Sequence, residues 1–248
     1  MLITSLENDK IKKCIKLKDK KYRDQYNEFL VEGDHLVIEA YRSGLLEEIL
    51  IKDDEVTMLD FEITYITEEI IKKLSTLETP SHIFGICKKR EENPDLGKKI
   101  LLLDRVQDPG NLGTIIRSSK AFGVDTIVLG NGCCDLYNEK VIRSTQGNGF
   151  TMNIVCGDLL EIIKELKEKE IPVLGTRVEF GEDIRNLTDR DKECYALVMG
   201  NEGRGVSGEI LEQCDKYIYI EMDNNVESLN VSIATSILLY ELSRWCYG

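Results

Sequence analysis

Five polar residues between positions 111 and 230 have side chains suited to chemistry: Asn111, Arg117, Glu202, Ser228 and Asn230. An arginine in the first turns of a helix that follows a strand is a fixed bidentate cation, which suits phosphate. A glutamate beside a glycine-rich loop can accept a hydrogen bond or face a cationic ligand. The plain alternatives are a surface arginine on an ordinary helix and a glycine-rich turn before a short helix.

These residues lie in three short segments. The first, residues 104–117, contains the turn Asp108-Pro109-Gly110-Asn111, in which Asp108 or Asn111 can cap the following helix. The second, residues 200–207, begins with three glycines in six residues, so its backbone can approach a ligand closely or form an amide-lined concavity. The third, residues 227–232, leads into the last helix, for which Ser228 is the expected N-cap.

The last helix, from Leu229 to Trp245, is apolar on most sides and must therefore be buried. One interpretation is a core helix of a single chain, and the other is that part of its surface packs on another subunit. Asn230 is a poor helix former in the first turn, which suggests that it is there for its side-chain amide.

Composition and missing motifs disfavour several classes of protein. The chain has 248 residues, of which 42% are hydrophobic and 31% charged, which predicts a folded protein of one large or two modest domains. The only histidines are His35 and His82, which argues against Ser-His-Asp or Cys-His catalysis in the last two thirds of the chain. The sequence also lacks the P-loop, dinucleotide-binding and zinc-protease motifs.

The cysteines and the apolar runs bear on the cellular compartment. The eight cysteines include no C-x-x-C pair, which favours reduced thiols over a disulfide framework or a zinc site, and we expect no metal. The sequence has no apolar run of about 18 residues and no secretory signal at its start, so we expect a cytoplasmic protein with no membrane partner.

The formal net charge of −13 disfavours a nucleic-acid partner on average, because phosphate neutralisation supplies most non-specific affinity. The stretch from Lys10 to Arg23 is a local exception, with seven lysines and one arginine against Asp19 alone. We call this stretch the front patch, and its pattern predicts an amphipathic helix. It could face RNA together with Lys88-Lys89-Arg90, and the alternative is a solvated helix face.

Apolar and helical patterns alternate through the chain. In the first 90 residues or so they predict a small α/β unit with strands at 29–31, 49–51, 63–66 and 82–87 and helices at 34–43 and 68–74. A charged stretch with one proline follows, so we place domain 1 at 1–92, a linker at 93–98 and domain 2 at 99–248.

Domain 2 is expected to be an α/β domain with a parallel sheet, because short apolar runs alternate there with helical segments. The predicted strands are 100–103, 126–129, 152–155, 172–174, 196–199 and 217–220. In such sheets ligands bind beyond the carboxyl ends of the strands. The loops that follow these runs are therefore where the chemistry is expected.

The three segments, in this order and spacing, resemble the SpoU/TrmH family of RNA ribose 2′-O-methyltransferases, within the SPOUT class. The stretch from Asn111 to Arg117 matches the motif N-x-G-x-x-x-R, with Phe122-Gly123 after it. Residues 200–205 match G-N-E-G-x-G, and residues 228–232 match S-L-N-V-S. The first 90 residues resemble the small ribosomal-protein-L30e-like substrate-binding domain that many members carry.

The resemblance implies S-adenosylmethionine as methyl donor, a trefoil knot in the C-terminal part of domain 2, and a homodimer with its site near the subunit interface. It implies that Arg117 acts on the RNA, where it orients the ribose 2′-hydroxyl and grips the adjacent phosphate. The other four polar residues named at the outset would organise that site. The backbone around four further residues would hold the cofactor: Thr176, Gly200, Ile220 and Leu229.

The chain departs from the family pattern at three positions. Glu221 stands where many relatives have proline, and Asn224 stands where they often have glycine, which puts the path of the cofactor loop in question. In the segment Arg143-Ser144-Thr145-Gln146-Gly147, Thr145 replaces a serine.

The leading hypothesis is therefore an S-adenosylmethionine-dependent RNA ribose 2′-O-methyltransferase that acts on a guanosine of large-subunit (23S) rRNA. A tRNA substrate is the first alternative. A non-catalytic RNA-binding or ribosome-assembly protein is the second, although a decayed relative should have lost some of the five polar residues. A domain that binds another adenine nucleotide is the third.

Overall fold

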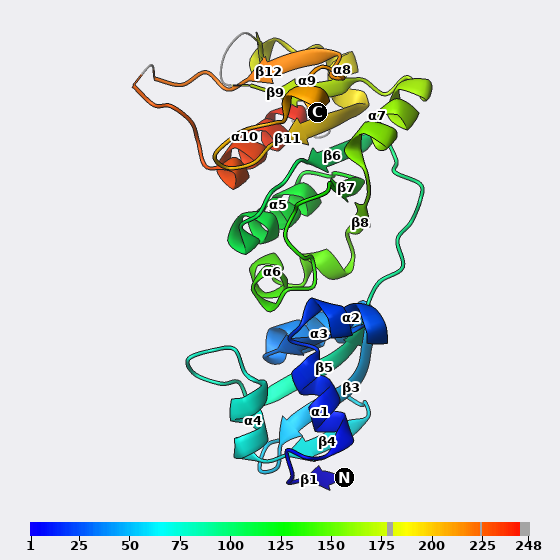
Figure 1. Cartoon of the computed structure of the whole chain (residues 1–248), viewed down its shortest axis with the longest axis vertical. Helices are drawn as coiled ribbons and strands as arrows, with labels where there is room; N and C mark the ends of the chain where they lie inside the picture. Colours follow the sequence, from blue (N-terminus) through cyan, green and yellow to red (C-terminus); the bar gives the residue numbers. More distant parts are fainter. Residues whose placement is uncertain (178–180, 224, 244–248) are drawn as a thin grey trace. The chain divides into compact units, whose positions relative to one another are not determined.

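The structure is a computed structural model that describes residues 1–177, 181–223 and 225–243 (Figure 1). The chain divides into two compact units. Unit 1 consists of Met1–Glu91 together with Asp135–Thr151, and unit 2 consists of Glu92–Cys134 together with Met152–Gly248. Residues 135–151 come from just past the midpoint of the sequence, yet they belong to the same unit as the first 91 residues.

Unit 1 is built on a five-stranded sheet of order β1-β4-β3-β5-β2. Strands β1, β4 and β3 run parallel to one another, and β5 is antiparallel to both β3 and β2. The strands are β1 (Leu2–Ile3), β2 (Glu28–Glu32), β3 (Leu46–Lys52), β4 (Ile63–Ile66) and β5 (Ile83–Lys88). The helices are α1 (Asp9–Lys16), α2 (Lys20–Tyr26), α3 (Asp34–Arg42), α4 (Glu68–Leu74) and α6 (Glu139–Thr145), with a short 3-10 turn η1 (Asn148–Phe150).

The predicted strands and helices of unit 1 are confirmed to within a few residues, but the front patch forms two helices instead of one. Helix α1 ends at Lys16, and Asp19 then caps α2 by accepting a hydrogen bond from the Lys21 backbone amide at 2.9 Å. The hydrophobic pattern alone does not show this break, because an N-cap inside a lysine-rich stretch leaves the apolar periodicity intact.

The segment 135–151 is held in unit 1 by aromatic and ionic contacts. The ring of Phe29, which is fully buried, lies 4.8 Å from that of Tyr137 and 5.9 Å from that of Phe150 between centroids. Arg23, which is buried, forms an ion pair with Asp135. Burial of these groups explains why the segment packs with unit 1 despite its place in the sequence.

Unit 2 contains a seven-stranded sheet of order β10-β12-β9-β11-β6-β7-β8, in which each neighbouring pair is parallel, as predicted. Its strands are β6 (Lys99–Leu103), β7 (Thr126–Leu129), β8 (Asn153–Cys156), β9 (Val173–Thr176), β10 (Glu182–Asp183), β11 (Tyr195–Met199) and β12 (Lys216–Tyr219). Its helices are α5 (Pro109–Ala121), α7 (Leu159–Glu168), α8 (Asp189–Glu193), α9 (Gly208–Leu211) and α10 (Val231–Ser243), with a 3-10 turn η2 (Ile184–Asn186).

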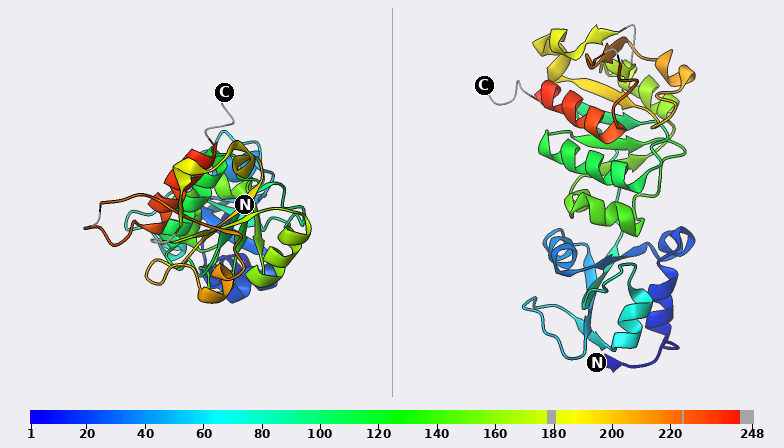
Figure 2. Two further views of the ribbon diagram at one scale, coloured as in Figure 1. Left: turned by 90° about the horizontal axis from the view of Figure 1, so that it is seen from above. Right: turned by 90° about the vertical axis from the view of Figure 1, so that its left-hand side faces the viewer.

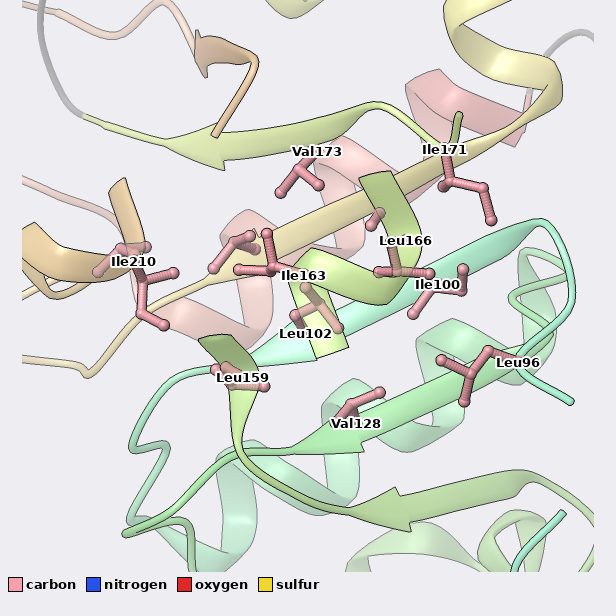
Figure 3. Packing of buried hydrophobic residues seen from close by; sticks show 13 residues of the cluster. Leu96, Ile100, Leu102, Val128, Leu159, Ile163, Leu166, Ile171, Val173 and Ile210 are labelled. Carbon is pink, nitrogen blue, oxygen red and sulfur yellow. The ribbon is translucent and has the colours of Figure 1, made fainter. Parts of the chain in front are cut away.

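Helices cover both faces of this sheet, which is why its central strands are apolar without alternation. On one face, residues of α7 and α9 pack on alternate residues of the strands, as Figure 3 shows for Ile163 and Leu166 over Ile100 and Leu102. Helices α5 and α10 lie side by side on the other face (Figure 2), where the hydroxyls of Ser118 and Ser236 are hydrogen-bonded at 2.7 Å.

The start of α10 differs from the prediction. The helix begins at Val231, and the Asn230 side-chain oxygen accepts hydrogen bonds from the backbone amides of Ser232 at 2.9 Å and Ile233 at 3.4 Å. Ser228 is thus not the N-cap, because Asn230 fills that position two residues later. The predicted helix end at Trp245 lies outside the described residues.

Candidate active site

A cavity of about 490 Å³ opens at the carboxyl ends of β9, β11 and β12. Its size is within the range of about 300–1,000 Å³ that is typical of small-molecule sites. All four residues predicted to hold the cofactor line it: Thr176, Gly200, Ile220 and Leu229. Two of the predicted catalytic residues, Glu202 and Ser228, line it as well.

The second segment forms one wall as a closed loop. Asn201 and Gly205 exchange two backbone hydrogen bonds, at 3.0 and 2.9 Å. A Cβ atom at Gly200 would lie 2.1 Å from the backbone carbon of Gly205, so only glycine fits there. The Asn201 side chain also accepts from the backbone amides of Gly203 at 3.0 Å and Arg204 at 3.2 Å. The three glycines therefore let the loop fold back closely on itself beside the cavity.

Three side chains connect the three segments. The side-chain amide of Asn111 donates to Glu202 at 3.1 Å, and that of Asn230 donates to the Asn111 oxygen at 3.0 Å. Asn111 sits in the first turn of α5, which Asp108 caps by accepting from the Asn111 backbone amide at 2.8 Å. We call Glu202, Asn111 and Asn230 the polar relay. It ties the glycine-rich loop to the first turns of both α5 and α10.

Glu202 is the acceptor at one end of the polar relay. Burial raises its pKa, but its own backbone amide, the Asn111 amide and the backbone amides of Asp108 and Gln107 donate to the carboxylate and together lower the pKa below its ordinary value. An ionised carboxylate with this many donors is a weak base. Its geometry suits the orientation of Asn111 and of the 107–108 backbone.

Arg117 stands apart from the cavity. It is exposed on α5 and does not line the cavity, and we find no ion pair or hydrogen bond to it among residues 1–177, 181–223 and 225–243. Its guanidinium is thus available to an anionic ligand. The structure brings the cofactor residues and four of the five polar residues together, but it does not join Arg117 to them.

Two arginines that the sequence motifs did not single out as site residues also line the cavity. Arg177 follows Thr176 at the end of β9, and its guanidinium lies 5.0 Å from the centroid of the Tyr217 ring. Arg204 lies within the glycine-rich loop. Their position in the sequence could have indicated both arginines, because each follows a strand of a parallel sheet. Ligands bind at the carboxyl ends of such strands.

Asp104 is a further residue that the motifs missed. It is buried at the end of β6, accepts a hydrogen bond from the Ser207 backbone amide at 2.7 Å and pairs with Arg105 at 3.1 Å. It anchors the far end of the glycine-rich loop to the neighbouring strand. A carboxylate directly after an apolar strand is the sequence signal that could have found it.

The departure at Glu221 has a local explanation. Arg185 in η2 forms ion pairs with both Glu221 and Asp183, the latter at 2.5 Å. Glu221 therefore fastens the chain after β12 to the η2 turn, which a proline at that position could not do. Asn224, the second departure, lies outside the described residues.

The cavity fits S-adenosylmethionine in both size and chemistry. Apolar side chains such as Met199, Ile218 and Leu238 line it beside the exposed backbone of the glycine-rich loop, a combination suited to an adenosyl group. No cluster of three or more His, Cys, Asp or Glu side chains that could hold a metal ion occurs within the described ranges. Nor is any described helix long and apolar enough to cross a membrane.

A parallel sheet with a cofactor-sized cavity at its carboxyl edge defines the class, an α/β enzyme that binds a nucleotide-like ligand. Residues 98–240 match the model of the SpoU rRNA methylase family, and residues 8–85 match that of the MRM3-like substrate-binding domain. The chain therefore belongs to the SpoU rRNA methylase family. It is an RNA 2′-O-methyltransferase that uses S-adenosylmethionine.

Individual relatives agree over the whole length. The chain is 40% identical to the 23S rRNA (guanosine(2553)-2′-O)-methyltransferase RlmP of Bacillus subtilis (strain 168), over 97% of this chain and 98% of that protein. Its structure resembles the AdoMet-bound rRNA methyltransferase of Sinorhizobium meliloti, with a TM-score of 0.88, 28% identity and coverage of 100% and 99% of the two chains. A crystal structure of an RNA 2′-O ribose methyltransferase gives a TM-score of 0.83 at 28% identity, with 98% of both chains covered.

Proposed function

We propose that this enzyme methylates the ribose 2′-oxygen of a guanosine in 23S rRNA. The observation that carries the proposal is the polar relay, which joins all three predicted motifs beside one cofactor-sized cavity. The 40% sequence identity to the Bacillus subtilis guanosine methyltransferase, over 97% of this chain, supports the choice of a 23S rRNA guanosine as substrate.

The proposed site works by positioning. Bound S-adenosylmethionine supplies an electrophilic methyl group, and the backbone around Thr176, Gly200, Ile220 and Leu229 holds it in the cavity. The polar relay ties together the loops beside which the ribose must lie, and Ser228 lines the cavity next to them. An in-line approach of the hydroxyl oxygen to the methyl carbon requires such preorganisation, which can contribute several kcal/mol, within the roughly 7–11 kcal/mol available from orientation.

We assign Arg117 to the RNA. An arginine side chain stays charged at neutral pH, so the Arg117 guanidinium is a poor proton acceptor and suits a phosphate clamp that stabilises developing charge. Its exposure, without a partner in the described ranges, supports this role. An active site near a subunit interface would require Arg117 to lie outside the cavity of its own chain.

The test is transfer of labelled methyl from S-adenosylmethionine to unmodified RNA, with the 2′-O-methyl mark mapped, for wild type and Arg117→Ala. We expect label at one guanosine of 23S rRNA and a loss of at least 100-fold in the variant, with cofactor affinity retained. Label in tRNA would overturn the substrate. Cofactor binding without transfer to free rRNA or to ribosomal precursor particles would favour a non-catalytic protein.

We further propose a homodimer that forms through α10. Ile233, Ile237 and Tyr240 are 52%, 36% and 52% exposed, and their spacing places them on one face of the helix. A second copy of the chain would cover this apolar face. Sedimentation should show a dimer for wild type and a monomer for the variant Ile233→Glu/Ile237→Glu, and a monomeric wild type would contradict the proposal.

The remaining assignments follow from the family. We propose that residues 1–92 bind substrate RNA, that 93–98 link them to a catalytic domain at 99–248, and that the C-terminal part of this domain forms a trefoil knot. Thr176, the glycine-rich loop and Leu229 line one cavity although they are far apart in sequence, which suits a knotted path. An rRNA substrate also supports action in the cytoplasm.

A further inference from the structure

The ion pairs of unit 1 divide the front patch into two groups of cations. Five of them have a carboxylate partner: Lys10 with Glu48, Lys12 with Glu7, Lys13 with Glu28, Lys20 with Asp24, and Arg23 with Asp135. A paired cation offers little net charge to RNA. Most cations of the front patch are therefore paired with carboxylates of the protein itself.

Lys16, Lys18 and Lys21 have no carboxylate partner in the part of the chain that the structure describes. The ammonium group of Lys18 donates to the backbone oxygens of Lys73 at 2.8 Å and Ser75 at 3.2 Å, so it has a structural task. Lys16 and Lys21 remain, and both are exposed. Within the described ranges, they are the two cations of the front patch with neither a carboxylate nor a backbone oxygen as partner.

Both of these lysines lie over one aromatic ring. The ammonium nitrogen of Lys16 is 5.3 Å and that of Lys21 is 5.7 Å from the centroid of Tyr22. Tyr22 is half-buried and stacks on Tyr26, with ring centroids 6.4 Å apart and planes inclined by 19°. A ring contact holds an ammonium group without cancelling its charge, and at an exposed site the contact is weak. The ammonium groups can thus move to a phosphate and uncover the ring.

We propose that Lys16, Lys21 and Tyr22 form a contact for a single-stranded segment of the substrate RNA. The two lysines bind phosphates of the strand, and the ring of Tyr22 stacks on a base. Proteins that bind unpaired RNA combine these two elements, since sequence-independent affinity comes from the phosphates and each base offers a flat face. This inference rests on the proposed function, because it presumes an RNA substrate.

The test compares two double variants that remove the same charge. Lys16→Gln/Lys21→Gln changes the proposed contact, and Lys164→Gln/Lys169→Gln removes two exposed lysines on or next to α7. Affinity for a 23S rRNA transcript is measured against salt for each variant, together with affinity for S-adenosylmethionine. We expect a loss on the order of tenfold at about 50 mM salt for the first variant and a salt slope lower by about 1.4, since each single-strand phosphate contact contributes about 0.7.

Two ring variants separate stacking from structure. Tyr22→Phe should keep the affinity, and Tyr22→Leu should lower it with the salt slope unchanged, because a lost stack removes no phosphate contact. Equal affinity of the two lysine variants would overturn the proposal. A loss of binding to an acidic peptide instead of RNA would reassign the surface to a protein partner.

The failure of this inference can be told apart from failure of the proposed function. If the wild type methylates rRNA and the two lysine variants bind it equally, only the contact is wrong. If the wild type binds the transcript but transfers no methyl to any RNA, the proposed function fails while the affinity comparison still decides the contact.

Discussion

The side-chain amide of Asn111 donates to the carboxylate of Glu202 at 3.1 Å, across 91 positions of sequence. Asn230 then donates to Asn111, so the motif of α5 is held between the glycine-rich loop and the cap of α10. A hydrogen bond to a charged group contributes about 1.5–3 kcal/mol. Substitution of one residue of the polar relay should therefore displace loops that belong to all three motifs.

Asn230 allows its two tasks to be separated. Asn230→Asp keeps the oxygen that caps α10 but loses the donor to Asn111, whereas Asn230→Ala loses both. We expect both variants to lower methyl transfer by tenfold or more, and only the alanine variant to lower the free energy of unfolding, by about 1 kcal/mol. Single-turnover transfer and urea unfolding measure the two effects. Equal stability of the two variants would show that the cap contributes nothing.

Gly200 should tolerate no side chain. The Cβ of Gly200→Ala would lie 2.1 Å from the backbones of Gly205 and Val206, so the loop would have to open. We expect affinity for S-adenosylmethionine to fall by more than tenfold in calorimetry. Gly208→Ala is the matched control, because nothing lies within 4 Å of its Cβ position, and it should bind as wild type does. Normal binding by Gly200→Ala would argue against this loop as a cofactor wall.

The lowered pKa of Glu202 predicts a pH dependence of stability. Its pKa in the folded state lies below the unfolded value of about 4.3, so the stabilisation is fully present above that pH and is lost as the pH falls through the folded pKa. Glu202→Gln should therefore be less stable than wild type at pH 7, and the difference should shrink below about pH 4. Thermal unfolding from pH 7 to pH 3 measures it. Glu165→Gln, which changes an exposed residue of α7, should show no such trend.

The pair of Arg23 and Asp135 should stabilise the attachment of residues 135–151 within unit 1. Arg23 is 4% exposed and also donates to the backbone oxygens of Leu17 and Lys18, both at 2.7 Å. Arg23→Met leaves Asp135 without its partner, which should cost about 3–5 kcal/mol. Hydrogen exchange in residues 135–151 should accelerate accordingly.

Lys20→Met is the control for this pair. It breaks the exposed contact with Asp24, where the side chains are 61% and 48% exposed, and should cost less than about 1 kcal/mol. Exchange in residues 135–151 that is equally slow in both variants would show that the buried pair does not hold the segment.

The sequence by itself determined the element types and the edge of the sheet at which the cavity opens. Strand and helix follow from the period of apolar residues, which the backbone geometry sets locally, and glycine at position 200 follows from a loop that must close on itself. Parallel strands share a carboxyl edge, so a ligand site could be expected in the loops there before any coordinates, and the resemblance to the family named Thr176, Gly200 and Ile220.

Only the tertiary structure decided which polar groups form hydrogen bonds or ion pairs within the protein. Asn230 became the cap of α10 while Ser228 turned to the cavity, and Glu48 and Glu28 reached Lys10 and Lys13 from distant strands. Hydrogen bonds and ion pairs act over a few ångströms in space, whatever the separation along the chain. A motif can therefore name the residues of a site, but the packing of strands and helices selects those left free to bind a ligand.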